Sequence, residues 1–392
     1  MPGRHFLFVP GPTNVPDRIL NALHVPMEDH RSSAFPALWH DLAPRLRRLF
    51  GTVEGRPLVF PGTGTGGWEA ALTNVLSPGD RVLAPRFGQF SHLWVALAEQ
   101  LGFEVDVLDG EWGTAAPIEQ IEKALRADRD HSIKALLIVH NETATGVTSD
   151  VAAVRRVQLA TGHPSLLLVD SVSGIGSLDF RMDEWGIDVA VTGSQKGLML
   201  PAGLAVLCAS PRAMEAAKHA TSRRSYFDFG ALAAANDQGY FPYTPSAPML
   251  RALRESLIML LDEEGMPTVI ARHHRLAEGV RRAVAAWGLT LCVREPRWHS
   301  DTVSTVVTPE GIDARKVIAR AFDRYDLSLG GGLGPLAGKA FRIGHLGDLN
   351  PLMLLGALAG VEMALLDCGV KLTPGSGVAA AEGYWRAGGM TV

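Results

Sequence analysis

Residues 187–207, IDVAVTGSQKGLMLPAGLAVL, decide the fold. Two short apolar runs in it, 187–191 and 203–207, are bounded by Gly or Pro, so each predicts a buried strand. Between them lies a small polar segment with Lys196 near its centre. A lysine at the end of a buried strand is costly unless its charge is paired or its amine is used, typically in a Schiff base with a carbonyl. A lone lysine in a loop is more often a surface residue, so the rest of the chain decides between the two.

The overall composition is that of an ordinary soluble enzyme. The chain has 392 residues, of which 47% are hydrophobic and 20% charged. A single core rarely grows beyond roughly 250–300 residues, so two domains are expected. The net charge of −4 gives no electrostatic case for nucleic acid or for a membrane surface as a partner. Thirteen histidines are scattered without metal-ligand spacing, so no metal is predicted.

Cysteine usage and the ends of the chain predict a cytoplasmic protein. Cys208, Cys292 and Cys368 lie far apart in apolar contexts and are expected to be free thiols in a reducing compartment. The apolar run near the N-terminus is too short for a signal peptide, and no stretch is long and uncharged enough to span a bilayer.

From residue 58 onward, strands alternate with helices. A short strand at 58–60 is followed by a helix that reaches Leu76, and further strand–helix pairs lead to the apolar run that ends at Asp170. This alternation predicts an α/β fold with a mostly parallel sheet and helices on both faces. Ligands of such sheets bind beyond the carboxyl ends of the strands.

Two boundaries divide the chain. Residues 1–17 are rich in Pro and Gly, which excludes a regular helix or a central strand, and their apolar start favours an arm pinned against another surface. After about residue 250 the pattern changes to long helical stretches, first at 250–264, with short strands between them. We therefore expect an arm at 1–17, a large domain at 18–265 and a smaller α+β domain at 266–392.

Two polar features fall at predicted strand ends. The loop 62–67 contains four glycines and two threonines between a strand and a helix. Its N–H groups, hydroxyls and helix N-terminus suit a phosphate, although a tight turn explains the glycines equally well. Asp170 follows a buried run and is either a helix cap or a carboxylate that pairs with a cationic ring nitrogen.

Together, a phosphate cradle, a carboxylate and a strand-end lysine are the three anchors of pyridoxal 5′-phosphate. The lysine holds the aldehyde, the carboxylate keeps the pyridine nitrogen protonated, and the loop holds the phosphate. Phe87, which follows a strand, is a candidate ring for the cofactor to lie against. Arg342 lies mid-strand in an apolar context after the glycine-rich loop 330–334, and is a candidate for binding a substrate carboxylate.

These residues resemble the class V, fold type I aminotransferases, and within them the alanine/serine:glyoxylate group. The resemblance runs over nearly the whole chain and is strongest to bacterial serine–glyoxylate aminotransferases. The motifs that carry it are Pro10–Asn14, Gly62–Gly67, Arg86–Trp94, His140–Gly146, Asp170–Val172, Ser194–Lys196, Gly239–Pro245, Gly330–Gly334 with Arg342, and Thr373–Ala381.

The resemblance implies a role for each matching position. Lys196 is the Schiff-base lysine, and Asp170 pairs with the pyridine nitrogen. The other cofactor-binding positions it implies are Thr63, Gly64, Thr65, Phe87, Thr143, Val172 and Gln195, with Thr244 donated by the partner subunit of a homodimer whose active sites are shared. Substrate binding falls to Arg342, Thr143 and Gly11.

Two positions differ from the better-known animal enzymes. Phe87 stands where those enzymes stack a tryptophan, and Phe241 stands where they use a tyrosine to contact the phosphate. Tyr240 and Tyr243 flank the second position without matching it.

We expect ping-pong transamination from L-serine to glyoxylate, giving hydroxypyruvate and glycine. L-Aspartate and L-alanine are the alternative donors, because they share the carboxylate and the amine that the site recognises. Arg31, Arg86 or the pair at 223–224 could supply a second arginine for a dicarboxylate. A fold-type-I lyase such as a cysteine desulfurase is disfavoured because it needs a cysteine on a mobile loop near the cleft.

Overall fold

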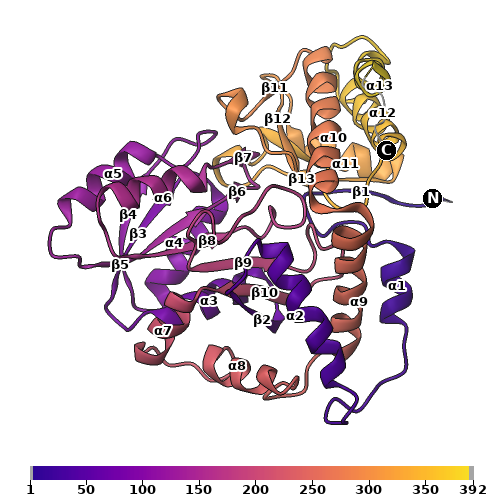
Figure 1. The fold of residues 1–392 in the computed structure, drawn as a ribbon. Helices are drawn as coiled ribbons and strands as arrows, with labels where there is room; N and C mark the ends of the chain where they lie inside the picture. Colours follow the sequence, from indigo (N-terminus) through magenta and orange to yellow (C-terminus); the bar gives the residue numbers. More distant parts are fainter. Residues whose placement is uncertain (1–2, 388–392) are drawn as a thin grey trace.

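Two β-sheets, each with its own hydrophobic core, organise the computed structural model, which describes residues 3–387 (Figure 1). The outermost residues of the predicted arm and of the predicted small domain, 1–2 and 388–392, lie outside the described residues. The core of the first sheet extends from Ile19 to Val269, and the second core from Leu276 to Trp385 with Phe8 added.

The larger sheet has seven strands and carries the stretch around Lys196. In spatial order they are β2 (Arg56–Gly62), β10 (Gly203–Ala209), β9 (Val189–Gly193), β8 (Leu166–Asp170), β5 (Ile133–Val139), β3 (Arg81–Arg86) and β4 (Glu104–Asp109). The five strands from β9 to β4 run parallel, and β10 pairs antiparallel with both β2 and β9. This confirms the predicted α/β fold with a mostly parallel sheet.

Helices from the same part of the chain pack on this sheet or on one another (Figure 1). They are α1 (Asp17–Leu23), α2 (Pro36–Phe50), α3 (Gly64–Val75), α4 (Gln89–Gln100), α5 (Ile118–Ala127), α6 (Val151–Ala160), α7 (Pro211–His219), α8 (Phe229–Asp237), α9 (Ala247–Leu257) and the π-helix η1 (Ile258–Glu264). Helix α3 packs against β9 and β10. Gly67 permits this approach, since a Cβ at that position would lie 2.6 Å from a methyl group of Val191.

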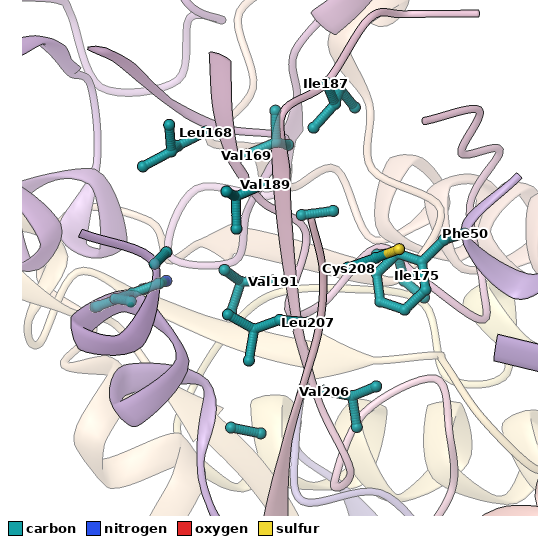
Figure 2. Packing of buried hydrophobic residues seen from close by; sticks show 14 of the residues in the cluster. Phe50, Leu168, Val169, Ile175, Ile187, Val189, Val191, Val206, Leu207 and Cys208 are labelled. Atoms are coloured by element: carbon teal, nitrogen blue, oxygen red, sulfur yellow. The ribbon is translucent and has the colours of Figure 1, made fainter. Parts of the chain in front are cut away.

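The strands next to the lysine segment are apolar on both faces because helices cover both sides of the sheet. Figure 2 shows the buried side chains of β8, β9 and β10, among them Val169, Val191 and Leu207. Strands β9 and β10 pair in register, with Leu207 opposite Val191. The connection between them, residues 194–202, therefore emerges from a rigid core.

The smaller sheet has five strands, in the order β1 (Phe6–Phe8), β13 (Leu327–Gly331), β14 (Ala340–Gly344), β12 (Val303–Val307) and β11 (Thr290–Leu291). Its core also contains side chains from four helices, namely α10 (Met266–Ala286), α11 (Ala314–Tyr325), α12 (Pro351–Asp367) and α13 (Ser376–Ala387). A two-stranded hairpin, β6 (Asn141–Glu142) with β7 (Val147–Thr148), and the 3-10 helices η2 (Pro296–Trp298) and η3 (Gly334–Leu336) complete the elements.

The N-terminal arm joins the sheet formed by the end of the chain. Strand β1 pairs parallel with β13 at the edge of the smaller sheet, with Phe6 opposite Leu327 and Phe8 opposite Leu329. An edge position is open to this Pro- and Gly-rich segment because only one side of the strand must pair. Docking of the arm on a partner subunit stays a prediction.

None of the helices among residues 3–387 combines the length and the apolar character needed to cross a bilayer.

Candidate active site

A cavity of about 140 Å³ lies at the carboxyl ends of the parallel strands. Its lining combines residues from segments that are far apart in the sequence. The polar ones are Thr63, Thr65, Asn141, Thr143, Asp170, Ser173, Gln195 and Lys196, and the others are Gly64, Val172 and the aromatic residues Trp68 and Phe90. Eight of the predicted site residues are therefore brought together. Parallel strands place their carboxyl ends at one edge, which explains why the loops converge.

Lys196 lies in the segment between β9 and β10, and its half-buried side chain lines the cavity. Its Nζ donates a hydrogen bond to the carbonyl oxygen of Pro10, at 2.5 Å. Burial lowers the pKa of Lys196 to about 8; the charge of Arg342 adds to this shift and that of Asp170 opposes it. About a tenth of the amine is therefore unprotonated at pH 7, far more than for an ordinary lysine, and this neutral form can act as a nucleophile or a base.

Asp170 ends β8 and is 4% exposed. One carboxylate oxygen, Oδ1, accepts a hydrogen bond from the backbone N–H of Val172 at 2.8 Å. Burial raises the pKa of Asp170 to about 7, while the Val172 N–H and the charge of Lys196 oppose the rise. A cationic group placed in the cavity would stabilise the ionised carboxylate.

The loop 62–67 becomes the entry to α3. Thr63 is the N-cap residue, and the helix begins at Gly64, so the first N–H groups of α3 face the cavity without intrahelical partners. Gly64 allows the close approach of Val172, because a Cβ at Gly64 would lie 2.6 Å from a Val172 methyl group. The positive end of a helix together with free N–H groups and threonine hydroxyls is an anion site.

Gln195 adds an unused amide to this cradle. Its side-chain oxygen is buried and has no hydrogen-bond partner among the described residues. The two ends of an amide exchange by a half-turn about the last side-chain bond, so Gln195 can present an N–H donor to an anion.

The opposite wall is a hydrogen-bonded group of small polar side chains. The hydroxyl of Thr143 lies 2.7 Å from that of Ser173, and the amide of Asn141 donates to the same Ser173 hydroxyl at 2.8 Å. Sequence reasoning identified Thr143 but missed Asn141 and Ser173. Their only sequence signal is their position next to Thr143 and Val172, two predicted residues.

Arg342 lies in the middle of β14, 8% exposed. Its Nε donates to the carbonyl oxygen of Gly331 at 2.8 Å, and its Nη1 donates to that of Thr143 at 3.3 Å. Burial lowers the pKa of Arg342 to about 10, which still leaves it charged at neutral pH. Because a guanidinium has five N–H groups, the remaining ones stay available for a carboxylate.

Gly11, on the N-terminal arm, lies directly against Lys196. Its φ is +122°, and a Cβ there would come within 2.3 Å of Lys196 Nζ. Thr13 fixes the contact, since its hydroxyl donates to the Lys196 carbonyl oxygen at 3.0 Å and its N–H to the Gln195 carbonyl oxygen at 3.2 Å. The arm therefore contacts both parts of the molecule: β1 pairs with the smaller sheet, and Gly11 and Thr13 contact the lysine segment of the larger sheet.

The aromatic residues of the cavity differ from the predicted one. Phe87 is fully buried beside β3 and is not among the residues that line the cavity, whereas Phe90 and Trp68 are. The buried indole Nε1–H of Trp68 faces the Asp170 carboxylate and helps to oppose the rise of its pKa, although the two groups are not in hydrogen-bond geometry. Trp68 directly follows the glycine-rich loop, and that position is the signal that sequence reasoning did not use.

Thr244 is exposed and does not line the cavity of its own chain. Phe241 instead packs edge-on against Phe35 and Trp39. The Tyr240 hydroxyl donates to the Ser32 carbonyl at 3.3 Å, whereas the buried Tyr243 hydroxyl has no partner within the described chain.

The additional arginines are placed elsewhere. Arg86 forms a two-point ion pair with Asp109, at 2.7 and 3.0 Å, and lines a separate groove. Arg224 donates to Asp228 and to backbone carbonyls of neighbouring turns. Neither Arg31 nor Arg223 is among the residues that line the cavity within the described chain.

The thiols of residues 3–387 lie outside the cavity. Cys208 is buried within β10, and burial raises the pKa of its thiol and that of Cys292, the latter to about 11. No cysteine lines the cavity, and no group of His, Cys, Asp and Glu has metal-binding geometry in the described part of the chain.

Comparison with known proteins gives consistent matches. The family model described as aminotransferase class-V matches residues 5–333. The chain is 57% identical to the serine–glyoxylate aminotransferase of Methylorubrum extorquens over 98% of this chain and 97% of that protein. It is 48% identical to the L-aspartate–glyoxylate aminotransferase of Paracoccus denitrificans, over 98% and 97%. The crystal structure of ureidoglycine–glyoxylate aminotransferase from Bacillus subtilis superposes with a TM-score of 0.91 at 30% identity, over 98% and 99%.

Proposed function

The chain belongs to the class V aminotransferase family, and from this premise we propose that it uses pyridoxal 5′-phosphate to transfer the amino group of L-serine to glyoxylate. The products are hydroxypyruvate and glycine. The observation that carries the proposal is the cavity that joins a lysine, a carboxylate and an anion cradle, with Arg342 beside them.

The residues present fit this cofactor. The buried Gln195 amide without a partner and the first N–H groups of α3 suit a phosphate. The second oxygen of the buried Asp170 carboxylate suits a protonated ring nitrogen. Thr63, Gly64, Thr65 and Gln195 would thus hold the phosphate, and Asp170 the ring nitrogen.

The remaining contacts would fall to three other residues. Val172 and Thr143 would hold the ring, and Lys196 would hold the aldehyde carbon. When bound, the cofactor supplies a carrier for the amino group and a ring that takes up electron density from the substrate's Cα. The protein supplies orientation and proton transfer.

Lys196 would move the proton. Its lowered pKa of about 8 makes the neutral amine accessible, so Nζ can accept the proton from the substrate's Cα as a general base. The Pro10 carbonyl and the packing of Gly11 restrict where that amine can point. Arg342 would bind the α-carboxylate and so orient the Cα–H bond toward Nζ.

The choice of L-serine rests on the charge of the site. Within the described chain, Arg342 is anchored beside the cavity at Thr143, no second arginine lines the cavity, and Arg86 is already paired with Asp109. Burying the second carboxylate of aspartate without a cation would be costly, whereas a serine hydroxyl needs only polar neighbours. The 57% identical relative named as a serine–glyoxylate aminotransferase supports the same choice.

We further propose a homodimer with shared sites. Thr244 is exposed and lies away from its own chain's cavity, as a residue donated to a partner's phosphate site would.

The test is the visible absorption spectrum of the purified protein supplied with pyridoxal phosphate, before and after one amino acid is added without a keto acid. We expect a yellow band that L-serine bleaches faster than equal concentrations of L-alanine or L-aspartate. Faster bleaching by L-aspartate would overturn the assignment of L-serine as the amino donor. The absence of any band would overturn the assignment of pyridoxal phosphate as the cofactor.

A further inference from the structure

Glu142 is a carboxylate that the proposed chemistry does not use. It lies on β6, directly between the cavity-lining residues Asn141 and Thr143, and is completely buried. Burial raises the pKa of its carboxyl group, and backbone donors oppose the rise. A buried acid is retained at such a cost only where its hydrogen bonds are needed.

The carboxylate of Glu142 binds the first turn of α4. Its Oε2 accepts from the N–H of Phe90 at 3.0 Å, from the N–H of Ser91 at 3.0 Å and from the Ser91 hydroxyl at 3.2 Å, while Oε1 accepts from the N–H of Ala144 at 3.2 Å. All these partners are donors. A negative charge at the N-terminus of a helix is also favoured by the helix dipole.

Ser91 carries this contact on to the loop before α4. Its hydroxyl oxygen accepts from the N–H of Phe87 at 3.1 Å and from the N–H of Gly88 at 3.0 Å. Gly88 leaves room for the acid, since a Cβ there would lie 2.3 Å from Glu142 Cγ and Cδ. The position of residues 87–91 is therefore set by Glu142.

Along the chain, Glu142 is followed directly by Thr143, which contacts the proposed substrate-binding arginine. The next residue, Thr143, hydrogen-bonds Ser173 through its hydroxyl, and its carbonyl oxygen accepts from Arg342 Nη1. One buried carboxylate thus connects the cavity wall that contains Phe90 to the hairpin turn whose Thr143 carbonyl anchors Arg342.

We propose that Glu142 is a positioning residue that fixes residues 87–91 at the start of α4, and with them the Phe90 side of the cofactor site, against the segment that contains Thr143. This inference rests on the proposed function, because it assumes a flat cofactor beside that wall. Glu142 itself touches neither cofactor nor substrate.

Replacement of Glu142 by glutamine separates positioning from packing. The amide keeps the shape but turns an NH₂ group toward N–H donors, so at least one contact becomes repulsive. Residues 87–91 should shift, whereas the two backbone acceptors of Arg342 remain. We therefore expect weaker cofactor binding and a lower kcat, with the KM for L-serine unchanged or lower.

The matched control is Glu362, another buried acid, distant from the cavity. It accepts from the indole of Trp287 at 2.8 Å and from the N–H of Gly377 at 3.0 Å, within the core of the smaller sheet. Glu362→Gln should lower thermal stability as Glu142→Gln does, but it should leave the cofactor affinity and kcat within about twofold of wild type.

The experiment measures three quantities for wild type, E142Q and E362Q. The first is the dissociation constant of pyridoxal phosphate, obtained by titrating the cofactor into cofactor-depleted protein and detecting binding by visible circular dichroism. The other two are kcat and KM for L-serine. For E142Q the dissociation constant should rise roughly 10- to 100-fold, as loss of one or two charge-assisted hydrogen bonds implies. Unchanged affinity, or a KM that rises in step with the fall in kcat, would overturn the inference.

Gly88→Ala provides an independent second variant if E142Q does not fold. Gly88 has an extended backbone with φ of −173°, which any residue adopts, so the variant tests only the contact with Glu142. The same pattern is expected, and wild-type affinity in G88A would contradict the inference. If wild type itself is not bleached by L-serine, the proposed function fails separately, because the cofactor affinities do not depend on the donor.

Discussion

The two sheets contribute to the site in opposite ways. The larger sheet supplies Asp170, the cradle at 63–65 and Lys196 from the ends of neighbouring strands, so a continuous apolar core beneath them holds their spacing. The smaller sheet supplies only Arg342, from the middle of a strand. Groups that would hold a cofactor thus share one rigid edge, whereas the group that would bind substrate stands on a separately packed core.

The N-terminal arm bridges this division. Its strand β1 belongs to the smaller sheet, and a few residues later Pro10, Gly11 and Thr13 contact the lysine segment of the larger one. This geometry implies that substitutions in the larger sheet affect cofactor binding and proton transfer, whereas a substitution of Arg342 affects substrate binding.

The largest effect is expected at the lysine. Lys196→Ala removes both the amine that would hold the cofactor and the general base, so transamination should fall by at least about 10⁴-fold. The substitution removes no core contact of the sheet, so the thermal unfolding midpoint should change little. Turnover that stays substantial in a steady-state assay with L-serine and glyoxylate would remove the central claim.

On the other side of the cleft, Arg342→Ala should affect substrates most. Loss of a charged two-point contact is worth about 1.5–3 kcal/mol, so KM for both L-serine and glyoxylate should rise roughly 10- to 150-fold. The affinity for pyridoxal phosphate should change much less, because all of its proposed ligands except Thr143, whose carbonyl oxygen Arg342 contacts, lie at the edge of the larger sheet.

Arg86→Ala is the control for the arginine. It removes an exposed ion pair with Asp109, so KM for L-serine should stay within about twofold. If R342A lowered cofactor affinity as much as substrate affinity, the separation between the two sheets would not hold.

This separation also explains what the sequence could predict. The groups of the larger sheet stand beside short buried runs with glycine or polar residues at their ends, so local pattern alone placed Asp170, the glycine-rich loop and Lys196 at one edge. Arg342 was noticed only as an unusual charge in an apolar strand. Its anchors are the carbonyls of Gly331, on an adjoining strand, and of Thr143, in the turn between β6 and β7, and no local pattern encodes either contact.

Other features depended on tertiary contacts and were missed for that reason. Strand β1 was not expected, because three apolar residues beside prolines predict a strand only when a partner such as β13 is known. The predicted helix at 250–264 is α9 followed by the π-helix η1, a difference in hydrogen-bond register that residue periodicity does not resolve. Phe90 and Trp68 line the cavity because of the orientation of α4 and α3.

A smaller effect is expected where the arm meets the lysine. Gly11→Ala places a Cβ within 2.3 Å of Lys196 Nζ at a φ of +122°, so kcat should fall about tenfold through displacement of the amine. Gly102→Ala has comparable backbone strain, with φ of +85°, and open space around the new Cβ. Both variants should lose about 1–2 kcal/mol of stability. A similar loss of kcat in G102A would mean that strain, not contact with the lysine, is responsible.

The smallest effect is expected in the pH dependence of stability, which reports how far the Lys196 amine is desolvated. In cofactor-free protein the pKa of Lys196 falls from 10.5 to about 8, so between these pH values the unfolded chain binds more protons than the folded one. The free energy of unfolding should therefore rise with pH across this window, relative to Lys196→Met, by about 1–2 kcal/mol after allowance for the partial exposure of the side chain. Urea unfolding of both proteins between pH 7.5 and about 10.5 measures the difference. If the free energies of unfolding of the two proteins instead changed in parallel with pH, the amine would be solvated in the absence of cofactor. The larger sheet alone would then not lower the pKa of Lys196.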